Sequence, residues 1–126
     1  MIGAKVTLFI QKRGATSKDD DIIRIYETPD FTEMFRVVYK PGEFKERQNQ
    51  FYMPRHVLQH YISDLMKSLN ADADPFEYIQ VTTAQHPSVL YHISDLDNRG
   101  TRYMIEDMIM EAVRIPIEAV KISRRE

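Results

Sequence analysis

Cysteine is absent from the sequence, and glycine is scarce, with four residues in a chain of 126. Without cysteine the chain forms no disulfide and offers no thiolate nucleophile or cysteine-ligated metal site. No glycine-rich phosphate loop is present, and no serine lies in a Gly-x-Ser-x-Gly elbow. These absences remove several classes of enzyme from consideration, and we expect a protein without a bound cofactor.

Long apolar runs are absent as well. The longest hydrophobic stretches span only a few positions, so we expect no transmembrane helix and no membrane partner. Residues 1–5 show no charged leader followed by an apolar segment, so we expect no secretory signal and a chain that starts at its natural N-terminus. Together with the lack of cysteine, this predicts a cytoplasmic or other reducing intracellular location.

The composition that remains is that of an ordinary globular domain. Hydrophobic residues make up 43% and charged residues 29% of the chain, a mixture that argues against global disorder. A chain of this length buries enough apolar surface to fold without a disulfide or a metal ion. We therefore expect residues 1–126 to form a single domain. The net charge of −2 is too close to neutral to identify a nucleic-acid-binding protein from bulk charge.

Hydrophobic and polar residues alternate in several segments, which is the pattern of half-buried strands. Polar stretches predict flexible loops near 13–20 and 41–50, and a frayed tail at 124–126. The predicted strands are 4–12, 21–28, 33–40 and 76–83, with shorter candidates at 43–50, 89–94 and 119–123. If the first three strands form a meander, the face turned away from the helices carries basic and aromatic residues: Lys5, Phe9, Arg24, Tyr26, Arg36 and Lys40.

Two further segments carry apolar residues at the spacing of one helical face. Pro54 is expected in the first turn of a helix whose apolar stripe spans residues 57–69. Thr101 is the expected N-cap of a second helix whose stripe spans residues 104–113. Strands interrupted by two helices predict an α+β fold, with a mainly antiparallel sheet of four to six strands and both helices packed on one face.

Basic and aromatic side chains are interleaved between residues 36 and 55. This segment holds five basic and two acidic residues, although the whole chain is slightly acidic. Cations that follow phosphates and flat rings that stack on bases are the means by which proteins bind single-stranded nucleic acid. We therefore expect a non-enzymatic binding module for such a partner. The predicted site consists of Arg36, Lys40, Phe44, Lys45, Arg47, Phe51, Tyr52 and Arg55.

Two other functions remain open at this point. Seven methionines and thirteen aromatic residues are generous for this length, and both types are enriched at interfaces. The chain would then be a structural or adaptor protein, and we expect a homo-oligomer, with a two-fold dimer as the first choice. The third function is a small enzyme that uses His86, His92 and Asp95, since imidazoles near a carboxylate can carry acid–base chemistry.

Two patterns partly match metal-binding motifs, but no metal site is predicted. His56, His60 and Asp64 recur every four residues and so share one side of a helix, yet the central glutamate of the zincin motif is missing. Residues 95–106 place Asp, Asp, Gly and Glu as a calcium loop does, but Arg99 occupies a position that requires an oxygen ligand. We interpret this segment as a polar loop that leads into a helix.

Overall fold

Six strands and two α-helices make up most of the described chain. The computed structural model describes residues 3–14, 20–28, 34–42, 48–70, 72 and 75–115. In chain order the elements are β1 (Val6–Lys12), β2 (Asp21–Glu27), β3 (Met34–Lys40), β4 (Asn49–Pro54), α1 (Arg55–Ser68), β5 (Phe76–Thr83), β6 (Val89–His92), the 3₁₀ helix η2 (Ile93–Asp97) and α2 (Arg99–Arg114). All neighbouring strands pair antiparallel, in the order β4-β3-β2-β1-β5-β6.

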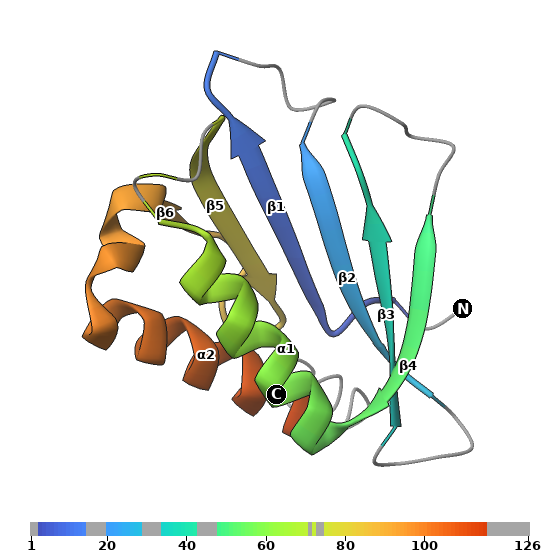
Figure 1. Cartoon of the computed structure of the whole chain (residues 1–126). Coiled ribbons are helices and arrows are strands. Elements are labelled where there is room, and N and C mark those ends of the chain that lie inside the picture. Colours follow the sequence, from blue (N-terminus) through green and yellow to red (C-terminus); the bar gives the residue numbers. More distant parts are fainter. Residues whose placement is uncertain are drawn as a thin grey trace.

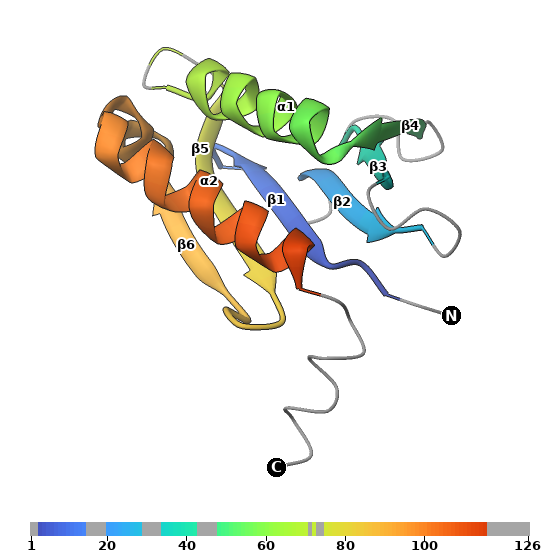
Figure 2. The ribbon, with the colours of Figure 1, turned by 90° about the horizontal axis from the view of Figure 1, so that it is seen from below.

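Both helices lie on the same face of this sheet (Figures 1 and 2). α1 follows the edge strand β4 and leads the chain across that face toward β5, and α2 packs beside α1. The protein is therefore a single α+β domain with a six-stranded antiparallel sheet, and the predicted fold class is confirmed. Within the part of the chain that the structure describes, no helix is long and apolar enough to cross a membrane.

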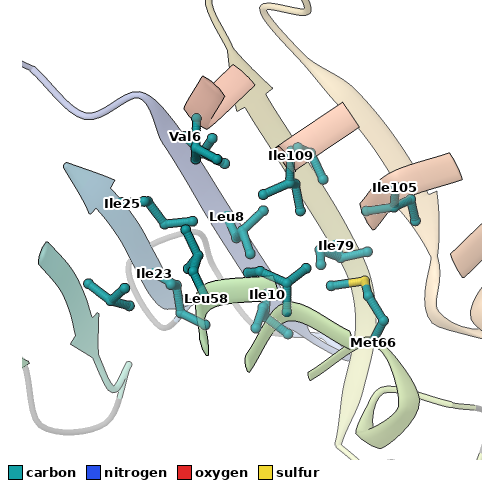
Figure 3. Packing of buried hydrophobic residues seen from close by; sticks show 14 of the residues in the cluster. Val6, Leu8, Ile10, Ile23, Ile25, Leu58, Met66, Ile79, Ile105 and Ile109 are labelled. Atoms are coloured by element: carbon teal, nitrogen blue, oxygen red, sulfur yellow. The ribbon is translucent and has the colours of Figure 1, made fainter. Parts of the chain in front are cut away.

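The core lies between the sheet and the two helices. Alternation along the strands sends Leu8 and Ile25 toward the helices, and neither side chain is exposed to solvent. Figure 3 shows them beside Leu58 of α1 and, further along the sheet, Ile109 of α2, both of which are also fully buried. Full burial of one such side chain contributes roughly 1.5–3 kcal/mol, so this layer supplies most of the force that holds the helices on the sheet.

The apolar stripe of each helix is narrower than the sequence predicted. Val57 at the start of α1 is 40% exposed and Met104 of α2 is 65% exposed, so neither belongs to the core. The start of α2 also differs, because the helix begins at Arg99 and its N-cap is Asn98. The Asn98 side chain accepts a hydrogen bond from the backbone N–H of Thr101 at 3.2 Å. Thr101, which was predicted to be the N-cap, therefore lies inside the first turn of the helix and donates to the cap.

Three other boundaries of helices and strands differ from the sequence prediction. Pro54 ends β4 and is the N-cap of α1, whereas the sequence predicted it inside the first turn. The candidate strand at 89–94 is divided between β6 and η2. The candidate at 43–50 became a strand further along the chain, β4, because residues 51–54 continue the pairing with β3. Several predictions lie outside the described residues: the loop segments 15–19 and 43–47, the strand 119–123 and the tail 124–126.

Lys5 is buried on the helix side of the sheet, which corrects its predicted place on the opposite face. Its Nζ donates a hydrogen bond to the carbonyl oxygen of Val113 at 2.6 Å and lies 3.7 Å from Oε1 of Glu27. Lys5 is 6% exposed, and this burial lowers its pKa from the ordinary 10.5 in spite of the Glu27 carboxylate. The alternation rule failed because Lys5 precedes β1, at a bend in the chain.

We expect substitution of Lys5 by methionine to remove a pH-dependent penalty on folding. Because the pKa of Lys5 is lowered in the folded state, its protonated form opposes folding at neutral pH, and the penalty fades as the pH rises toward 10.5. The free energy of unfolding of the wild type, measured by chemical denaturation, should therefore increase relative to that of Lys5→Met between about pH 7 and about pH 10. A difference that stays constant over this range would contradict the assignment.

Candidate functional site

The sheet face opposite the helices is covered by no helix or strand of the described chain (Figure 2). The strand register fixes which side chains lie there, because every second residue points to the same face. We call this surface the open face. Its residues are Thr7, Phe9, Gln11, Ile22, Arg24, Tyr26, Met34, Arg36, Val38, Lys40, Gln50, Tyr52, Tyr78, Gln80, Thr82, Leu90 and His92.

Charge is sorted between the two faces of the sheet. Among the strand residues that pair in register, the open face carries Arg24, Arg36 and Lys40 and no carboxylate; Glu77 lies at the bulge of β5 and has no register partner. The acidic residues of β2, Asp21 and Glu27, alternate onto the helix side. A chain with a net charge of −2 therefore presents a positively charged sheet surface, which attracts anions.

Arg36 lies between two tyrosines at one corner of the open face. It is the cross-strand partner of Tyr26 on β2 and of Tyr52 on β4. Its guanidinium carbon is 4.2 Å from the centre of the Tyr26 ring, and Tyr52 is 62% exposed. A guanidinium stacked on a ring keeps its N–H donors at its rim. This corner therefore combines flat stacking surfaces with hydrogen-bond donors for an anion.

A second group of rings lies at the opposite corner. Tyr78 on β5 and His92 on β6 are cross-strand partners whose ring centres are 5.1 Å apart, edge to face. Phe9 on β1 lies between the two corners. The sequence prediction did not include Tyr78 or His92 in the site. The signal was present in residues 78–83, where Tyr78 alternates with buried residues, but the neighbour of this strand is not evident from the sequence.

The eight residues predicted as a binding site do not form one cluster. Arg36, Lys40 and Tyr52 share the open face. Phe51 is the neighbour of Tyr52 and so points to the helix side of β4, where it remains 46% exposed. Arg55 begins α1 in the helix layer. The others, Phe44, Lys45 and Arg47, lie outside the described residues.

A buried carboxylate holds the turn that follows Lys40. Asp21 is 7% exposed and accepts hydrogen bonds from the backbone N–H of Gly42 at 2.8 Å and the hydroxyl of Tyr39 at 3.1 Å. Lys12 Nζ lies 3.8 Å from the same carboxylate. Burial raises the pKa of Tyr39 to about 12, and the charge and hydrogen bond of Asp21 add to the effect. This cluster fixes the end of β3 and thereby the place of Lys40 on the open face.

A groove of about 620 Å³ lies in the helix layer, between the start of α1 and the end of α2. Its charged side chains have both signs, and Arg114 lies 3.4 Å from Glu111 across one turn of α2. Because the groove carries both charges, its lining favours neither an anionic nor a cationic ligand. The lining residues are Pro54, Arg55, His56, Gln59, Asp107, Met110, Glu111 and Arg114.

The residues of the enzymatic alternative are not brought together as a catalytic group. His86 lies in the turn before β6, and His92 lies at the far end of that strand. Asp95 uses its Oδ2 to accept the backbone N–H of His92 at 3.1 Å, and the imidazole Nδ1 accepts the backbone N–H of Ser94. Asp95 and His92 therefore cap η2, and neither histidine lines the groove.

Neither metal pattern forms a site. His56, His60 and Asp64 are all exposed along α1. Residues 95–106 form the end of η2 and the first turns of α2, so they do not form a calcium-binding loop. In the described ranges, no three His, Cys, Asp or Glu side chains are grouped so that they could hold a metal ion.

Comparison of the chain with protein-family models, with curated proteins and with solved structures gives no match. The functional argument therefore depends on the geometry and charge of the open face.

Proposed function

We propose that the protein is a non-enzymatic binding module that holds single-stranded nucleic acid on the open face of its sheet. One observation carries the proposal: at the positions that pair in register, this face combines solvent-accessible rings with three cations and no carboxylate. Phosphates are attracted to such a surface without any opposing charge, and bases can stack on the rings.

The individual roles follow from position. Arg24 and Lys40 donate to phosphates, while Arg36, stacked on Tyr26, offers a donor rim beside an aromatic plane. Tyr52 is 62% exposed and stacks on a base. A single strand can turn its bases toward a flat surface, whereas the bases of a duplex are stacked on each other inside the helix. The open face therefore favours a single strand over a duplex.

The test is fluorescence anisotropy with a labelled single-stranded oligonucleotide over a series of salt concentrations. Three phosphate contacts predict a slope of about −2 for the logarithm of the binding constant against the logarithm of the salt concentration, at roughly −0.7 for each contact in a single strand. A duplex of the same length should bind more weakly. Absence of binding at low salt, or binding that is indifferent to salt, would refute the proposal.

A further inference from the structure

The rings of the open face follow one diagonal of the sheet. By cross-strand register, Tyr52, Arg36 and Tyr26 occupy one row at the corner formed by β4, β3 and β2. Tyr78 and His92 occupy another row at the corner formed by β5 and β6. The two rows lie at opposite ends of the strands, as the pairing of β1 with β2 and β5 fixes.

Phe9 completes this diagonal. It is the partner of Ile22 on β2 and of Gln80 on β5, so it lies one strand from Tyr26 and one strand from Tyr78. Arg24, the partner of Thr7, lies beside the diagonal between Tyr26 and Phe9. Every aromatic side chain that the described register places on the open face therefore lies on the diagonal, with a cation near its middle.

The two remaining corners contain no ring. One is formed by residues of β3 and β4 and carries Gln50, Val38 and Lys40. The other is formed by residues of β5 and β6 and carries Thr82, Gln80 and Leu90. Stacking can therefore occur along one diagonal of the open face, while the other diagonal offers amides, hydroxyls, aliphatic groups and the ammonium of Lys40.

Resting on the proposed function, we infer that a single strand crosses the open face along this ring diagonal, from the Tyr52 corner to the His92 corner. Strands about 4.8 Å apart and a rise of about 3.4 Å per residue give a diagonal of roughly 30 Å. A ligand must contain roughly five or more nucleotides to contact both corners, which lies within the range of site sizes of sheet-based single-strand binders. The ligand class is thus an oligonucleotide segment rather than a mononucleotide or a dinucleotide.

The two corners differ in charge, and this difference makes the inference testable. The Tyr52 corner contains Arg36 and lies near Arg24, whereas the far corner has no lysine or arginine at a position that pairs in register. A short oligonucleotide should therefore bind at the Tyr52 corner, and only a longer one should also reach Tyr78. The matched substitutions are Tyr52→Leu and Tyr78→Leu, which each remove one flat ring from a strand.

The experiment measures affinities of oligothymidylates of about three and about ten nucleotides for the wild type and both variants. Tyr52→Leu should weaken both ligands about tenfold, the effect of losing one stacked base. Tyr78→Leu should weaken the longer ligand by a similar factor and leave the shorter one unchanged. If Tyr78→Leu changes neither affinity while Tyr52→Leu weakens both, the diagonal path is wrong and the proposed function stands. If the wild type binds neither ligand at low salt, both the diagonal path and the proposed function are wrong. Circular dichroism is used to verify that the variants fold.

Discussion

Replacement of Arg24, Arg36 and Lys40 together by glutamate should weaken single-strand binding by at least about a hundredfold, since loss of each charge-assisted contact costs about 1.5 kcal/mol or more. These residues are the lysine and arginine side chains at the paired positions of the open face, so no other such cation would remain at those positions to contact phosphates. The slope of affinity against salt should fall to near zero at the same time, because the phosphate contacts that release counterions are removed.

A matched control exists in the helix layer. Arg55 and Lys67 of α1 and Arg114 of α2 are exposed cations on the other side of the molecule, and their replacement by glutamate changes the net charge by the same amount. We expect this control to change affinity by no more than about threefold, because bulk charge acts weakly across a distance greater than the Debye length. Equal loss in both triple variants would mean that the open face is not the site.

The same pair of variants tests the rival occupant of the face. If a second copy of the chain covers the open face, three glutamates there should change the mass of the assembly in sedimentation, and the helix-layer variant should not. In that case the wild type would bind oligonucleotide weakly or not at all, and the sequence-based expectation of a homo-oligomer would account for the exposed rings.

Periodicity alone was enough to predict the layers of this fold. Residues 21–28 and 33–40 alternate so regularly that the sides taken by Arg24 and Arg36 followed from the sequence, and residues 57–69 repeat at a helical spacing. Periodicity did not predict the position of Lys5. A lysine before a strand is ordinarily solvated, whereas this one is buried between Glu27 and the carbonyl of Val113 near the end of α2.

Only part of the site was predicted, because sequence patterns do not specify which strands pair across long separations. Arg36, Lys40 and Tyr52 share a face because β3 and β4 are adjacent in both sequence and space. Tyr78 joins them only because β5 pairs with β1 across a long separation in sequence, and no local pattern specifies that pairing. Phe51 was assigned to the same surface as Tyr52 because no strand was predicted over residues 51–54. In β4, consecutive residues point to opposite sides of the sheet.

Substitution of Asp21 by alanine should lower the free energy of unfolding by about 3 kcal/mol, the usual cost of removing one member of a buried charged network. The backbone N–H of Gly42 would lose its acceptor, the Tyr39 hydroxyl would lose its partner, and the carboxylate beside the Lys12 ammonium would be gone. Urea denaturation measures the loss. Asp21→Asn is the matched variant: it keeps one oxygen as acceptor for Gly42, replaces the oxygen that accepts from Tyr39 with an amide NH2, and removes the charge, so it should cost about half as much.

The pKa of Tyr39 provides an independent measure of the same cluster. Burial and then Asp21 raise this pKa to about 12, so Tyr39 ionises at a lower pH in the unfolded chain than in the folded protein. Tyr39 therefore contributes stability that is complete below about pH 10 and is lost as the pH rises toward 12. In Asp21→Asn the pKa of Tyr39, followed by ultraviolet titration against Tyr39→Phe, should fall but stay above 10, because burial remains. An unchanged pKa would show that Asp21 does not act on Tyr39, and Asp21 would then hold the end of β3 through Gly42 and Lys12.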